Sequence, residues 1–145
     1  MALSVLAEEN ILLNQQLATK EEAIRLAGQI LVDNRYVDAD YIEKMLEREA
    51  MTSTFMGNFV AIPHGTDDAK KDVKESGISI IQVPDGVDFG DGNIVKLIIG
   101  IAGKGGGHLD ILSNIAITVS DIENVENIVA ATSAKSILSF FERVN

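Results

Sequence analysis

The chain has 145 residues, of which 46% are hydrophobic and 23% are charged, a globular balance that argues against disorder and allows a sizeable core. Its formal net charge of −10 argues against nucleic-acid binding, because phosphate backbones are held by clustered Lys and Arg, and suits a basic protein partner instead. The absence of cysteine excludes disulfides, thiolate nucleophiles and cysteine metal sites.

The chain also lacks the signals of membrane insertion and export. No apolar run reaches the roughly 18 residues of a membrane span. The N-terminus has no basic region of the kind that opens a secretory signal. We therefore expect the chain to stay in the cytoplasm.

The first third of the chain predicts a short strand followed by two helices. The strand is expected around residues 10–13. Thr19 and Glu22 have the spacing of a capping box, and the helix that they begin should end near residues 33–34. A second helix is expected from residue 38 or 40 to about residue 50.

The second helix carries charges toward its apolar side. At about 100° per residue, Arg48 falls in line with Tyr41 and beside Met45, at the edge of the apolar face, and Glu49 falls nearer its middle. An inward charge is costly unless it is paired or used. Fraying of the last turn, Arg–Glu pairing and a functional role all remain open at this point.

A histidine is presented at the end of the next predicted strand. The apolar run 59–62 is typical of a short buried strand. Pro63 has no N–H to give to a ladder, and Gly65 allows the backbone to turn. His64 lies between them, so we expect its imidazole to be accessible.

The second half of the chain predicts further strands and then helices. A strand over 77–83 should end at Pro84-Asp85-Gly86, before a turn-rich loop over 85–93, and a strand over 94–102 is apolar enough to be buried on both faces. Residues 103–107 should form a flexible connection, after which His108 opens a helix. The last helices are expected over about 122–130 and from an N-cap at Ser133 to residue 144.

The order of these elements predicts an α/β fold. It corresponds to one domain over residues 1–145, a sandwich of a mixed β-sheet covered by α-helices. The strand order cannot be deduced from the pattern.

His64 and His108 are the two histidines, and both lie at junctions of predicted elements. If their strands are neighbours, the imidazoles would meet at one edge of the sheet, where strand ends and helix N-termini favour anions. Arg48 could join them. Such a set suits a phosphoryl group, with one imidazole as nucleophile and the other groups neutralising the oxygens.

Other interpretations of the histidines remain open. Both could be solvated loop residues. A zinc site would need further ligands, and Asp67 and Asp68 after Gly-Thr are more typical of turn chemistry. The glycine-rich 103–107 stretch lacks the spacing of a phosphate loop, so nucleotide binding is disfavoured.

Several motifs along nearly the whole chain occur in the order found in one family. They are Glu47-Arg48-Glu49, Ser53-Thr54, Gly57-Asn58, Val60-Ala61-Ile62-Pro63-His64-Gly65-Thr66, Pro84-Asp85-Gly86-Val87, Gly90-Asp91-Gly92 and His108-Leu109-x-Ile111-Leu112-Ser113. The chain resembles the IIA domain of the bacterial phosphoenolpyruvate:sugar phosphotransferase system, mannitol/fructose class. The 87–92 loop and the second histidine are similar to the mannitol branch. Phe89 departs from an expected tryptophan, and a glycine run replaces the polar residues usual before His108.

The resemblance implies a phosphotransferase that needs no cofactor. His64 would accept a phosphoryl group from HPr and pass it to a cysteine of a IIB component, while His108 and Arg48 stabilise the phosphoryl oxygens. The chain would meet the membrane only through the transport component. Two alternatives remain: a fructose-type or nitrogen-type regulatory IIA protein of the same fold, and a non-catalytic scaffold or metal-binding module.

Overall fold

A mixed five-stranded sheet lies at the centre of the computed structural model, which describes residues 4–106 and 108–144. The strand order is β1-β4-β5-β3-β2. Two neighbouring pairs, β1 with β4 and β3 with β5, are parallel, and the pairs β4 with β5 and β2 with β3 are antiparallel. The strands are β1 (Ile11–Leu12), β2 (Phe55–Gly57), β3 (Val60–Ala61), β4 (Gly77–Asp88) and β5 (Ile94–Ala102).

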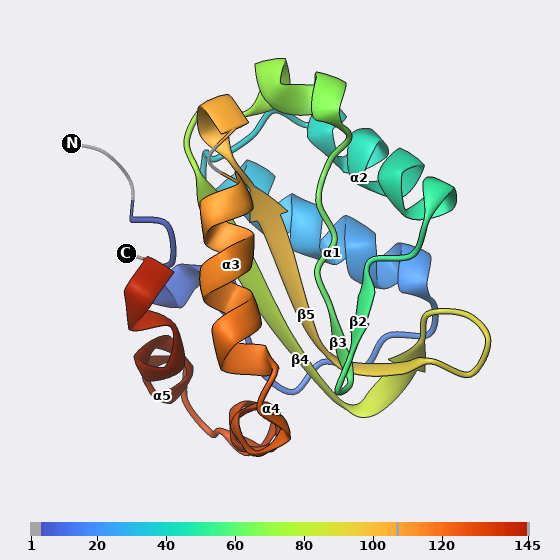
Figure 1. Cartoon of the computed structure of the whole chain (residues 1–145), viewed down its shortest axis with the longest axis vertical. Helices are drawn as coiled ribbons and strands as arrows, with labels where there is room; N and C mark the ends of the chain where they lie inside the picture. Colours follow the sequence, from blue (N-terminus) through green and yellow to red (C-terminus); the bar gives the residue numbers. More distant parts are fainter. Residues whose placement is uncertain (1–3, 107, 145) are drawn as a thin grey trace.

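Helices cover both faces of this sheet (Figure 1). One face packs against α1 (Lys20–Asp33) and α2 (Asp40–Met51), and the other against α3 (His108–Val119), α4 (Ile122–Ala130) and α5 (Ala134–Leu138). Successive residues of β4 serve opposite cores: Ile80 packs on the α3 side and Ile81 on the α1 side. The predicted α/β sandwich is therefore confirmed.

Short 3₁₀ segments connect several of these elements. They are η1 (Glu8–Asn10), η2 (Asp67–Asp72), η3 (Lys104–Gly106) and η4 (Ser139–Val144). The η3 turn occupies much of the predicted 103–107 connection, of which residue 107 lies outside the described residues. No helix in the described part of the chain is long and apolar enough to cross a membrane.

The helix predictions hold where local capping signals are strong. Thr19 accepts the Glu22 N–H at 3.2 Å and begins α1, which ends at Asp33 as expected. Ser133 caps α5, but this helix ends at Leu138 instead of running to residue 144. The backbone leaves helical geometry at Phe141, whose ring is buried in the core, so its packing overrides the continuation of the helix.

The strand predictions need two corrections. β4 continues through Pro84 to Asp88, because the register shifts between Gln82 and Val87 and the proline lies in this irregular stretch, where its missing N–H costs no regular ladder bond. Phe59 was expected in a buried strand. Instead it is 41% exposed with a φ of 68°, in the tight turn between β3 and a strand that was not predicted, β2.

Candidate functional site

His64 lies just beyond the end of β3, at an edge of the sheet that it shares with the end of β5. The two strands run parallel, and their pairing extends past β3 as an isolated bridge between His64 and Ile101. The Ile101 N–H donates to the Pro63 carbonyl at 2.9 Å, which holds this extension in place. The condition left open by the sequence, that these two strands are neighbours, is therefore met.

The ring of His64 is oriented by the backbone two residues before it. Its Nδ1 lies 2.9 Å from the Ile62 carbonyl oxygen, and the side chain is half-buried. A carbonyl can only accept a hydrogen bond, so Nδ1 carries the proton in this arrangement. In the neutral ring the lone pair is then on Nε2.

Tyr41 supports the His64 loop, the segment of residues 63–66, through hydrogen bonds of its hydroxyl. This role was not predicted from the sequence. Its hydroxyl donates to the Ile101 carbonyl at 2.8 Å and accepts the Gly65 N–H at 2.9 Å. Burial raises the pKa of Tyr41 to about 12, so the hydroxyl stays protonated and remains a donor. A Cβ at Gly65 would lie 2.6 Å from the Tyr41 ring, which explains the glycine. A buried tyrosine needs a hydroxyl partner, and that was the available signal.

A small open pocket lies beside His64. The residues that line it are Tyr41, His64, Gly65, Thr66, Asp67, Lys70, Val73 and Gly103. Lys70 is exposed there, so it places a positive charge at the rim. Asp67 is exposed there as well, so the pocket beside the imidazole is lined by residues of both charges.

Asp67 and Asp68 form the first turn of η2, and Asp68 takes part in contacts of this turn. The Thr66 hydroxyl donates to Asp68, and the Lys44 ammonium lies 3.2 Å from the same carboxylate. These two contacts hold the pKa of Asp68 below its usual value, and Asp68 in turn raises the pKa of Lys44. Among the side chains that the structure describes, no group of three or more His, Asp or Glu is arranged to hold a metal ion.

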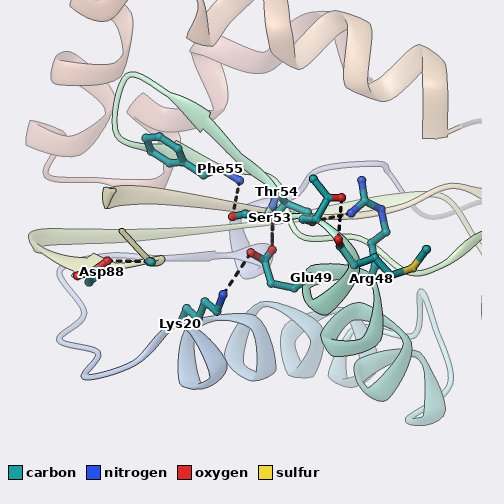
Figure 2. A network of polar contacts seen from close by, with 10 residues as sticks. Lys20, Arg48, Glu49, Ser53, Thr54, Phe55 and Asp88 are labelled. Atoms are coloured by element: carbon teal, nitrogen blue, oxygen red, sulfur yellow. Dashed lines mark hydrogen bonds and ion pairs between the residues drawn. The ribbon is translucent and has the colours of Figure 1, made fainter. Parts of the chain in front are cut away.

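Arg48 lies at the C-terminal turn of α2, against the connector of residues 52–54 that leads to β2. Its Nη1 donates to the Thr52 carbonyl at 2.7 Å (Figure 2). Arg48 is not one of the residues that line the pocket beside His64. The structure thus does not bring the guanidinium into that pocket.

His108 is the first residue of α3, as predicted, on the connection that follows the end of β5. The connection that leads to His108 therefore leaves the sheet at the edge where His64 lies. The side chain of His108 lies outside the described residues, so the predicted meeting of the two imidazoles stays a prediction.

Glu49, the inward charge of α2, is paired. It is 5% exposed, and its Oε1 accepts the Thr54 N–H at 2.9 Å and the Thr54 hydroxyl at 2.6 Å. Its other oxygen, Oε2, lies 3.8 Å from the Lys20 ammonium (Figure 2). Neither fraying nor Arg–Glu pairing explains this charge, because the helix continues to Met51 and Arg48 bonds to Thr52.

Comparisons with known proteins agree with this architecture. A family model described as "Phosphoenolpyruvate-dependent sugar phosphotransferase system, EIIA 2" matches residues 4–144. The mannitol-specific phosphotransferase enzyme IIA component of Geobacillus stearothermophilus is 64% identical over 145 residues, covering 100% of both chains.

Two solved structures from Escherichia coli are also similar. The crystal structure of IIA mannitol has a TM-score of 0.88 at 39% identity, covering 94% of this chain and 98% of that one. A complex of enzyme IIA mannitol with phosphorylated enzyme IIB mannitol has a TM-score of 0.88 at 36% identity, covering 95% and 97%. The chain therefore belongs to the EIIA 2 family of the phosphoenolpyruvate-dependent sugar phosphotransferase system.

Proposed function

We propose that this chain is a mannitol-specific IIA component, a phosphotransferase that carries a phosphoryl group on His64. The observation that carries the proposal is the bond from Nδ1 of His64 to the Ile62 carbonyl, which places the proton on Nδ1 and the lone pair of the neutral ring on Nε2. The 64% identity to a relative named as a mannitol-specific IIA component supports the choice of sugar.

Both transfer steps exchange one bond to phosphorus for another. In the first, Nε2 of His64 attacks the phosphorus of a phosphohistidine on HPr, and the N–P bond of the donor breaks as the new N–P bond forms. In the second, a cysteine thiolate of the IIB component attacks, and the bond to His64 breaks. The donor already carries an activated phosphoryl group, so the scheme requires no nucleotide.

Arg48 and His108 are the proposed stabilisers of the phosphoryl oxygens. A guanidinium has several N–H donors in a planar fork, so Arg48 can keep its bond to Thr52 and still offer others to a phosphoryl group. His108 lies at the N-terminus of α3, where the helix dipole favours negative charge.

The partners follow from the same scheme. We propose HPr as donor and IIB as acceptor, because a homologous IIA protein forms a complex with phosphorylated IIB. The net charge of −10 suits a basic donor surface and would speed the encounter. We further propose that residues 1–145 act as one unit in the cytoplasm and meet the membrane only through the transport component.

The test begins with phospho-HPr that carries a radioactive phosphoryl group. Wild-type protein should acquire an acid-labile phosphate on Nε2 of His64, located by nuclear magnetic resonance. The His64→Ala variant should acquire none, and His108→Ala should acquire it more slowly. Equal labelling of His64→Ala and wild type would refute the carrier role.

The second stage offers purified IIB domains to the phosphorylated protein. Faster transfer to a mannitol-type IIB than to a fructose-type IIB is expected. Preference for the fructose-type domain would assign the chain to that branch, and labelling without transfer to either would indicate a regulatory protein.

A further inference from the structure

Glu49 is a buried carboxylate that the scheme above does not use. A charge taken out of water is costly unless hydrogen bonds compensate it. Both of the strong bonds of Glu49 go to one residue, Thr54, through its N–H and its hydroxyl. Within the described residues Oε2 has no hydrogen-bond donor, and Lys20 lies 3.8 Å away. The hydrogen bonds that compensate the buried carboxylate therefore come from Thr54.

Thr54 is connected to His64 through one intermediate residue. The Thr54 carbonyl accepts the Ile62 N–H at 3.1 Å. The Ile62 carbonyl in turn accepts Nδ1–H of His64 at 2.9 Å. Three hydrogen-bonded links, from Glu49 to Thr54, from Thr54 to Ile62 and from Ile62 to His64, thus lead from the carboxylate to the imidazole.

On its β2 side, the sheet gives this region little support. β2 and β3 pair only through Phe55 with Ala61 and Gly57 with Val60, with a register shift between the two pairs. The bond from Ile62 to Thr54 lies next to the Phe55–Ala61 pair, on the side toward His64. Figure 2 shows the Glu49 carboxylate between the Lys20 ammonium and the Thr54 backbone, where it fastens the connector to α2.

We propose that Glu49 is a positioning residue for phosphoryl transfer, an inference that rests on the function proposed above. Its carboxylate holds Thr54, and Thr54 holds the Ile62 backbone so that the Ile62 carbonyl faces Nδ1 of His64. This keeps the proton on Nδ1 and the lone pair on Nε2, aimed at the phosphorus. Glu49 itself touches neither the phosphoryl group nor His64.

The experiment compares Glu49→Ala with Glu49→Gln in the full chain. Glutamine keeps an oxygen that can accept both bonds from Thr54, whereas alanine removes it. Val125→Ala, at a buried position of α4 whose side chain takes part in none of these hydrogen bonds, is the control for lost stability. The tautomer of His64 is measured by long-range ¹⁵N–¹H spectra of the unphosphorylated protein, with signals assigned by comparison with His108→Gln. The rate of uptake from phospho-HPr is measured per folded molecule.

Glu49→Ala should lose the single Nδ1–H tautomer and slow phosphoryl uptake on the order of tenfold, because misplacement of a reacting group costs rate steeply. Glu49→Gln should restore both to within about threefold of wild type. Val125→Ala should keep the wild-type tautomer and rate. A folded Glu49→Ala with the wild-type tautomer and rate would overturn the proposal.

A second variant covers the case in which Glu49→Ala does not fold. Thr54→Val removes the hydroxyl bond to Glu49 and keeps the N–H bond and a similar volume. A partial loss of the Nδ1–H tautomer supports the proposal, and an unchanged spectrum and rate contradict it. A wild-type protein that takes up no phosphoryl group would refute the proposed function, yet the tautomer comparison would still be valid.

Discussion

The hydroxyl of Tyr41 offers the sharpest test of how the His64 loop is supported. Tyr41→Phe removes this hydroxyl and leaves the ring in place, so no large cavity opens. Two bonds are lost, the one donated to the Ile101 carbonyl at 2.8 Å and the one accepted from Gly65 at 2.9 Å. The Ile101 carbonyl is buried and loses this partner, whereas Gly65 is half-buried and its N–H can turn to water.

The Ile101 carbonyl is left buried without its hydrogen bond, and the Gly65 N–H exchanges its partner for water. Together these losses should lower the free energy of unfolding by roughly 2 kcal/mol. For a chain of this length that corresponds to a melting temperature lower by about 4–8 °C. Phosphoryl uptake should also slow. Gly65 follows His64 directly, so the imidazole of His64 would lose its fixed position.

Urea titration gives the stability change, and labelling by phospho-HPr gives the transfer rate. Tyr36→Phe is a matched control: the Tyr36 hydroxyl also joins a donor and an acceptor, Asn10 and Ser4, but it contacts neither His64 nor Gly65. Both variants should lose stability, and only Tyr41→Phe should lose rate. Equal rates in the two variants, or an unchanged stability of Tyr41→Phe, would refute the assigned support.

The same variant has a signature at alkaline pH. Burial raises the pKa of Tyr41 from 10.0 to about 12, so between these values the unfolded chain has lost the proton and the folded chain keeps it. The wild-type free energy of unfolding should therefore fall through this window, by up to about 1.4 kcal/mol per pH unit. Tyr41→Phe lacks this loss, so the stability difference between the two proteins should narrow as the pH rises.

Other substitutions test neighbouring parts of the structure. Gly65→Ala places a Cβ 2.6 Å from the Tyr41 ring, and overpacking of this kind should cost about 1–3 kcal/mol in urea titrations and slow phosphoryl uptake. Thr19→Ala removes the cap that binds the Glu22 N–H and should lower stability by about 1 kcal/mol with unchanged transfer per folded molecule. The lowered pKa of Asp68 means that its contribution to stability is present above the unfolded pKa and is lost as the pH falls, so Asp68→Asn should flatten the acid side of the stability profile.

Much of the site could be predicted because its signals are local. His64 stands between a proline and a glycine, which alone place it at a strand end. The position of Glu49 on the apolar face also predicted that its charge must be paired or used, since helical phase depends only on position along the chain. The partner that satisfies it, Thr54, was not predicted, because it lies beyond the helix end in a connector without periodicity.

The sequence by itself determined where most helices begin, where β5 runs and which histidine is presented, since caps and apolar runs act over a few neighbouring residues. Only the tertiary structure decided that β3 lies parallel to β5, that β4 continues past Pro84 and that Tyr41 bonds to Ile101, 60 positions away. These features depend on contacts between distant segments, and their energies exist only once the sheet has assembled. The site at His64 combines both: the local Ile62 carbonyl orients the imidazole, and the distant Tyr41 hydroxyl and Ile101 N–H hold the residues on either side of it.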